Sequence, residues 1–156
     1  MSYARRSFSF TEEPRGRAYR VLLEHGLRQS THASLVQRRD CALDAGAKAV
    51  LRDLTPSLRL QREVSGWSGT RLVAGTALLR EYHLSEATVR VLSSAVDGLY
   101  DWCQPSRPED LVLWRGDGDP WLVAVAHERD AYLWGTRPEL TDLLREHPEL
   151  RPLLPV

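Results

Sequence analysis

The chain has only two cysteines, Cys41 and Cys103, and no long apolar segment. Two thiols without a CxxC pair are too few for a disulfide framework, and they match none of the Cys/His spacings that bind zinc. A membrane-spanning helix needs about 18 consecutive apolar residues, and a secretory signal peptide needs a continuous apolar core. These absences argue against a disulfide-stapled or membrane-spanning protein, and we expect a cytoplasmic protein with reduced thiols.

Lysine is almost missing as well, because Lys48 is the only lysine among 21 basic residues. This arginine bias is typical of a GC-rich bacterial genome, and it reflects codon usage more than function. The net charge is zero, but residues 1–50 carry nine basic and five acidic side chains, whereas residues 101–156 carry six and eleven. We therefore expect one charged patch, rather than the whole molecule, to attract a charged partner.

The length and the overall composition are those of an ordinary globular protein. The chain has 156 residues, of which 42% are hydrophobic and 27% are charged. A domain of this length buries about 68–70% of the surface of its unfolded chain, which is enough for a core without staples. We expect residues 1–13 to form a flexible or strand-like arm and residues 14–156 to form a single α+β domain.

The first part of the chain predicts two helices around a short strand. Apolar residues recur at helical spacing after Pro14, and Gly26 stands where a left-handed residue would end that helix. Residues 33–38 have the pattern of a strand. Asp40 is a suitable N-cap for a second helix that Pro56 would end, because its carboxylate can accept hydrogen bonds from the first-turn amides.

The middle of the chain predicts two strands and a third helix. Residues 58–64 alternate only in part, because Arg62 interrupts their apolar face. A turn at residues 66–69 then leads into a longer predicted strand over residues 72–82. Ser85 is placed to cap the helix that follows.

The last third has the clearest pattern. Three short apolar segments at 111–114, 121–127 and 131–134 are separated by turn residues, which predicts an antiparallel three-stranded meander. Thr136 and Glu139 have the spacing of a capping box that begins a fourth helix. The expected fold class is α+β, with one mainly antiparallel sheet, this C-terminal meander and about four helices packed against it.

Two residues are weak candidates for chemistry. Cys41 would lie in the first turn of the second helix, where the helix dipole favours a thiolate, although most free cysteines are simply buried. His127 would end a strand, with Glu128 on the opposite face, so a His–Glu pair would need a bulge. A carboxylate from elsewhere could still make His127 a general base. We predict no catalytic residue beyond these two, no cofactor and no metal ligand.

Tryptophan is frequent, with five in the chain and four of them after residue 100. Core packing is the ordinary explanation for each. Trp114, however, alternates out of phase with Leu111 and Leu113, and an outward Trp beside an arginine and an acidic turn is typical of an interface anchor. The predicted binding residues are Trp67, Trp114, Arg115, Asp117 and Asp119.

No motif specifies a reaction, so we expect a non-enzymatic protein-binding module, such as a toxin-neutralising immunity protein or a small regulator. The alternative is a small-ligand-binding protein or an enzyme with a pocket near His127 or Cys41. Nucleic-acid binding through the N-terminal arginines ranks third, because they are not interleaved with aromatic residues and no helix-turn-helix pattern is present. A solvated helix face is the more ordinary explanation for these arginines, and ion pairs with the acidic last third are a further alternative. The expected partner is another protein, and no membrane is expected.

Overall fold

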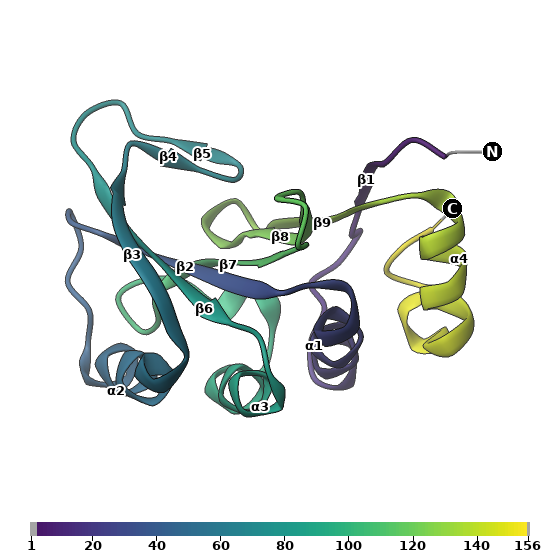
Figure 1. Ribbon diagram of the computed structural model, residues 1–156, viewed down its shortest axis with the longest axis horizontal. Helices are drawn as coiled ribbons and strands as arrows, with labels where there is room; N and C mark the ends of the chain where they lie inside the picture. The colour runs from purple at the N-terminus through teal and green to yellow at the C-terminus, as the bar shows by residue number, and fades with distance from the viewer. Residues whose placement is uncertain (1–2, 156) are drawn as a thin grey trace.

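An antiparallel sheet of seven strands runs through the protein, which a computed structural model describes over residues 3–155 (Figure 1). The order of the strands is β1-β9-β8-β7-β2-β6-β3, and β4 and β5 form a separate hairpin. The strands are β1 (Arg6–Ser9), β2 (His32–Arg38), β3 (Leu58–Val64), β4 (Gly66–Trp67), β5 (Thr70–Arg71), β6 (Ala77–His83), β7 (Glu109–Trp114), β8 (Pro120–Val125) and β9 (Asp130–Gly135).

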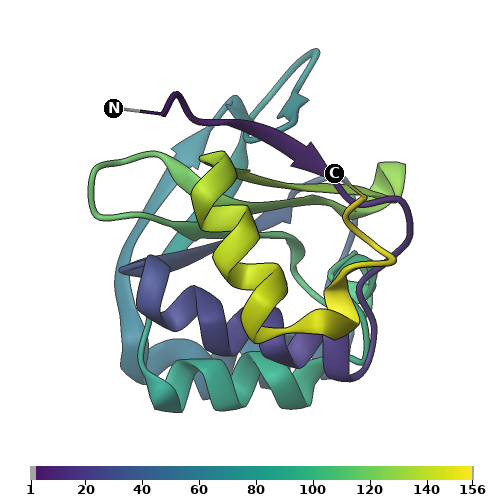
Figure 2. The ribbon, with the colours of Figure 1, turned by 90° about the vertical axis from the view of Figure 1, so that its right-hand side faces the viewer.

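The helices lie on one side of this sheet and the β4–β5 hairpin lies on the other (Figure 1). Figure 2, viewed from the side of α4, shows α1 and α3 below the sheet and α4 in front of its end. The helices are α1 (Arg17–Gln29), α2 (Ala45–Leu54), α3 (Glu86–Ala95) and α4 (Arg137–Glu146), with short 3-10 turns η1 (Thr55–Ser57), η2 (Leu99–Asp101), η3 (Ala126–Glu128) and η4 (Pro148–Leu150). No helix within residues 3–155 is long and apolar enough to cross a membrane.

The predicted α+β class, the antiparallel sheet and the C-terminal meander are confirmed. Strands β7, β8 and β9 are sequential antiparallel neighbours, as their short connections require. Ser85 caps α3 by accepting a hydrogen bond from the Thr88 amide. Thr136 and Glu139 form the predicted capping box at the start of α4.

Two helix boundaries differ from the prediction. Helix α2 is capped by Asp44 rather than Asp40, because the Asp44 carboxylate accepts from the Ala47 amide at 3.0 Å. Gly26 does not end α1 but lies inside it, where a Cβ would approach Leu113 Cδ1 to 2.5 Å. The sequence signal at Gly26 therefore reflects close packing against the sheet rather than a helix end.

Two strand predictions were too long. The strand predicted over 72–82 is interrupted by Gly75, which has φ 77°, so that β6 begins only at Ala77. The strand predicted over 121–127 ends at Val125, and the η3 turn follows it. Within the predicted arm, β1 pairs with β9 and so adds an edge strand to the sheet, while residues 1 and 2 lie outside the described range.

The main core lies between the sheet and the helices. It includes Trp102, which is fully buried and donates through Nε1 to the Tyr19 hydroxyl at 3.1 Å. Tyr19 in turn donates to the Leu92 carbonyl at 2.6 Å, so both buried polar groups are satisfied. Two smaller apolar clusters lie elsewhere, one around Val36 and Leu79 and one around Val123.

The basic first part and the acidic last part of the chain meet inside one molecule. Most of the N-terminal arginines use carboxylates from beyond residue 100 as ion-pair partners. The pairs are Arg5 with Asp117 and Asp119, Arg15 with Asp101, Arg17 with Glu149, Arg28 with Glu146, and Arg38 with Glu109. These pairs give the basic residues of the first part and the acidic residues of the last part a role within the fold.

Candidate functional site

The turn between β7 and β8, predicted as a binding surface, is tied into the fold by Arg115. This side chain is only 6% exposed, and its guanidinium donates to Glu139 Oε1 at 2.9 Å and to the Trp134 carbonyl at 2.9 Å. Burial raises the pKa of Glu139, but the Thr136 amide and Arg115 outweigh it and hold the pKa below its usual value. Arg115 therefore joins β7 to α4 and has little surface to offer a partner.

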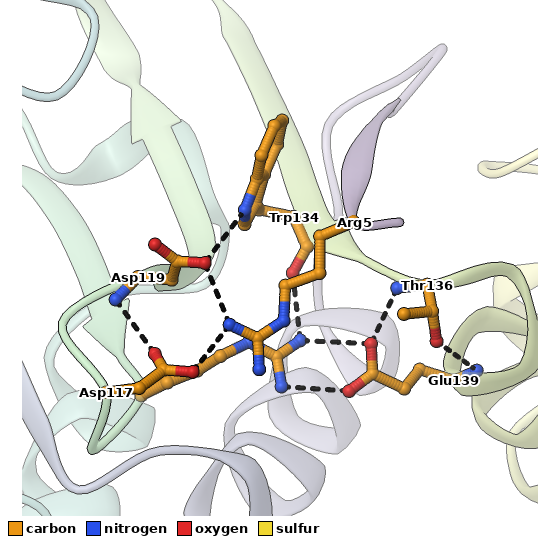
Figure 3. Close-up of polar contacts among 7 residues, drawn as sticks. Arg5, Asp117, Asp119, Trp134, Thr136 and Glu139 are labelled. Carbon is orange, nitrogen blue, oxygen red and sulfur yellow. Dashed lines mark hydrogen bonds and ion pairs between the residues drawn. The ribbon is translucent and has the colours of Figure 1, made fainter. Parts of the chain in front are cut away.

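Asp117 and Asp119 are bridged by one arginine of the N-terminal arm (Figure 3). Arg5 Nη1 lies 2.6 Å from Asp117 Oδ2 and 2.8 Å from Asp119 Oδ2, and Trp134 Nε1 donates to Asp119 at 3.4 Å. The Asp119 amide and then Arg5 lower the pKa of Asp117. Both carboxylates remain about half exposed, but Arg5 of the same chain already pairs with both of them.

The two predicted tryptophans also have partners within the chain. Trp114 is half-buried, stacks on His32 and donates through Nε1 to Ser34 Oγ at 2.8 Å. Trp67, in the β4–β5 hairpin, donates through Nε1 to Asp110 Oδ2 at 2.8 Å. Asp110 stands near the start of β7, so Trp67 meets that strand at the end opposite to the Arg115 turn.

A polar cluster that the sequence did not predict is centred on Glu109 and Asp110. Both residues are 0% exposed, and Asp110 has φ 57°, in the left-handed region that side chains rarely adopt. The register between β2 and β7 shifts here by one residue, from Ser34 opposite Val112 to Val36 opposite Glu109. This bulge lets two adjacent carboxylates approach one another, whereas a regular strand would point them to opposite faces.

Glu109 is held from one side only. Its Oε1 forms an ion pair with Arg38 Nη2 at 3.0 Å and accepts a hydrogen bond from the Gln104 amide at 3.1 Å. Its Oε2 is buried without a hydrogen-bond partner among the described residues. Gln104 also fixes the end of β2, because its side chain exchanges hydrogen bonds with the backbone of Arg38.

Asp110 accepts two hydrogen bonds, one on each carboxylate oxygen. The donors are Trp67 Nε1 and the Ala126 amide, each at 2.8 Å. Burial raises the pKa of Asp110, and these two hydrogen bonds oppose the rise. The carboxylate thus connects the hairpin to the end of β8.

His127 stands at the edge of this cluster with 39% of its side chain exposed. Its Nδ1 lies 3.8 Å from Asp110 Oδ2. Asp110 is therefore a carboxylate from another element of the fold, which is what His127 would need to act as a general base. Its Nε2 lies 3.9 Å from Glu128 Oε1. The expectation that Glu128 faces away from His127 is wrong, because both residues belong to the η3 turn rather than to a strand.

The cysteines gain little from the structure as candidates for chemistry. Cys41 lies in the turn before α2, not in its first helical turn, so the predicted effect of the helix dipole does not apply. Its carbonyl accepts from Gln104 Nε2 at 2.6 Å. Burial and then the Glu109 carboxylate raise the pKa of Cys103, which makes it a poor nucleophile.

The edge strand β3 is exposed along nearly its whole length. It pairs only with β6, and no backbone hydrogen bond from another described segment reaches residues 58–64. Leu58 and Leu60 are two of the four large hydrophobic side chains that are exposed within residues 3–155. The broken alternation at Arg62 was the only sequence signal that this strand lacks a covered face.

Comparisons with protein-family models, with curated proteins and with solved structures found no match to this chain. The function is therefore inferred from the geometry of the molecule.

Proposed function

We propose that the protein is a protein-binding module that accepts an extended, acidic segment of a partner protein along the free edge of β3. The observation that carries this proposal is the exposure of β3, a seven-residue strand at the end of the sheet. Unpaired backbone groups of such an edge can pair with an added strand, and the exposed side chains then determine which segment fits. An immunity protein and a small regulator both act by binding another protein, so either role is compatible with this proposal.

The backbone of β3 is suited to strand addition. Its only irregularity is a register shift between Leu58 and Leu60, which leaves residues 60–64 as regular strand. It contains no proline, which is one device that blocks unwanted pairing at sheet edges. The exposed Leu58 and Leu60 provide apolar contacts for the side chains of an added strand.

The charges around this edge favour an acidic partner. Glu63 is paired with Arg39, and Glu81 on β6 is paired with Arg59 at 3.4 Å. Arg62 and Arg71 have no ion-pair partner among residues 3–155, and both are exposed. The partner segment that complements these two free cations carries Asp or Glu.

Site-directed crosslinking in the cells that produce the protein tests this proposal. A photoreactive phenylalanine analogue replaces Leu60, and the same analogue replaces the exposed Arg20 of α1 as the matched control. We expect one discrete adduct from position 60 only, with the crosslink mapped to an acidic segment of the partner. Hydrogen exchange of the purified complex should then show new protection at residues 60–64.

The outcomes are distinct. Loss of the adduct in an Arg62→Glu variant supports the acidic partner, because the reversed charge repels it. A position-60 adduct no stronger than that of the Arg20 control would reject the proposal. An adduct with a second copy of the same chain would also reject it, in favour of self-association.

A small-ligand or catalytic function at His127 is the second candidate, because of its contact with Asp110. A carboxylate that orients an imidazole is the arrangement found in many general bases. A thermal-shift screen with metabolites tests this candidate, since a ligand of the folded state raises the melting temperature. A shift that His127→Ala abolishes supports it, and a panel without any such shift rejects it.

A further inference from the structure

We infer that Glu109, Asp110 and His127 form a binding site for one divalent transition-metal ion of the Zn²⁺ or Mn²⁺ type. Each residue brings one ligand atom to within 4.8 Å of those of the other two. The spacing suits a shared cation after small side-chain movements, because metal–ligand bonds to nitrogen and oxygen are about 2.0–2.2 Å long. This site is separate from the β3 edge and does not depend on the function proposed there.

The backbone holds two carboxylates together at a cost to stability. Side chains rarely adopt a left-handed backbone conformation, and Asp110 adopts it where it is completely buried. Strained backbone of this kind persists where the surrounding structure enforces it, and it concentrates at functional sites. Here its result is the convergence of Glu109 and Asp110 on the side chain of His127.

The charges within the cluster do not balance. Two fully buried carboxylates face one guanidinium, that of Arg38, which contacts Glu109 Oε1 and is shared with the exposed Asp40. Glu109 Oε2 has no hydrogen-bond partner although it is buried, and such an orphan acceptor is costly. A divalent cation would use this oxygen and neutralise the excess negative charge.

The groups around the three residues are those that usually support metal ligands. Ligating carboxylates are themselves hydrogen-bonded, as Asp110 is by Trp67 and Glu109 is by the Gln104 amide. A ligating histidine usually directs its second ring nitrogen to a carboxylate, and Glu128 lies 3.9 Å from Nε2 of His127. This arrangement leaves Nδ1 of His127 for the metal ion.

The kind of metal follows from the donor set. Two carboxylates and one imidazole suit Zn²⁺ or Mn²⁺, whereas Mg²⁺ and Ca²⁺ prefer oxygen ligands alone. The partly exposed side chain of His127 gives the ion a route from solvent. Three protein ligands with open positions are typical of reactive rather than purely structural metal sites.

A second group, His25, Glu146 and His147, has a similar spacing but a different environment. Arg28 Nη2 lies 2.9 Å from His25 Nδ1 and also contacts Glu146, so a guanidinium already occupies the position of a cation. This group therefore serves as the internal control.

Titration of the chelator-treated protein with Zn²⁺, and separately with Mn²⁺ and Mg²⁺, tests the inference by calorimetry. We expect one ion of Zn²⁺ or Mn²⁺ per chain and no comparable binding of Mg²⁺. Removal of a direct ligand in His127→Ala or Glu109→Gln should weaken binding by at least about 100-fold, beyond the loss caused by changes around a ligand. His147→Ala should bind as the wild type does.

The variants are chosen so that failure to fold does not obscure the result. His127 is partly exposed, so His127→Ala should keep the circular dichroism spectrum and the melting temperature of the metal-free protein. Co²⁺ provides a second measurement, because its visible absorption spectrum should appear with the wild type and be lost with His127→Ala. Equal affinity of the wild type and His127→Ala, loss of binding in His147→Ala alone, or no binding at millimolar Zn²⁺ or Mn²⁺ would overturn the inference.

Discussion

The meander of β7, β8 and β9 and the edge strand β3 are the two parts of this sheet that differ most. Strands β7 and β8 are buried at nearly every position, whereas β3 is exposed at all but its last residue. The meander segments are continuous apolar runs, typical of strands covered on both faces, and β3 mixes leucines with charged residues. The strong apolar pattern of the meander thus predicted buried strands, and the weak pattern of residues 58–64 corresponds to a strand that is exposed.

Charged groups show the same contrast. Both carboxylates of the acidic turn of the meander pair with Arg5, and the buried Arg115 is paired with Glu139. Arg62 on β3 has no such partner among the described residues. The charged groups of the Trp-rich meander therefore pair within the fold, while β3 keeps an arginine that is unpaired within residues 3–155, as the proposed binding of an acidic partner requires.

Arg115→Ala should have the largest effect on stability. Removal of one partner from a buried ion pair costs about 3–5 kcal/mol, and we expect the lower end because Glu139 is 34% exposed. Urea unfolding measures the change. The matched Arg62→Ala variant should lie within about 0.5 kcal/mol of the wild type, as surface substitutions usually do. Equal effects of the two variants would contradict the contrast between the meander and β3.

Gly69→Ala should lower the stability by an intermediate amount, because Gly69 lies where the β4–β5 hairpin contacts the meander. Gly69 has φ 82°, and an added Cβ would collide with Val125 Cγ2 of β8. The left-handed backbone alone costs roughly 1–2 kcal/mol for alanine. Hydrogen exchange should show faster opening of the hairpin than of β7 and β8, and uniform opening of the whole sheet would show that the hairpin is not a separate unit.

Acidification should destabilise the region beneath the meander. Burial and then Arg28 lower the pKa of His25, which stacks on Trp121, while Glu146 opposes the shift. The unfolded chain gains a proton near pH 6.5, so this contribution to stability is present above that pH and is lost as the pH falls toward the folded pKa. Each unit by which folding lowers the pKa contributes about 1.4 kcal/mol to the free energy of unfolding.

Unfolding of His25→Gln at pH 7.5 and pH 5.5 measures this contribution. The variant should lose less stability on acidification than the wild type, because the titrating ring is gone. His83 is exposed, so His83→Gln is the control. Its stability should depend on pH as that of the wild type does. If His25→Gln shows the full loss on acidification, the acid sensitivity does not come from His25.

Local patterns predicted most of the fold but little of the polar cluster. Ser85, Thr136 and Glu139 act on their own helices, so their spacing predicted the caps correctly. Asp40 resembled a cap equally well, and only the packing of the segment before α2 decided in favour of Asp44. Sequence spacing could not separate two aspartates four residues apart.

The cluster of Glu109, Asp110 and His127 depends on information that no local window contains. Its carboxylates converge through a bulge against β2, and its histidine arrives from the end of β8. The sequence predicts His127 as a candidate, but within a regular strand. The adjacent Glu109 and Asp110 were the only available signal, and regular alternation would have separated their side chains.

Leu60→Asp should have the smallest effect on stability and a large effect on binding. Leu60 is already 36% exposed on an edge strand, so we expect the free energy of unfolding to change by less than about 1 kcal/mol. The new carboxylate would repel an acidic segment and remove an apolar contact, so crosslinking of the partner from a neighbouring β3 position should be lost. Leu60→Thr keeps the strand propensity without the charge and should retain part of the crosslinking, which separates repulsion from loss of the leucine. A partner that binds Leu60→Asp as well as it binds the wild type does not use this edge.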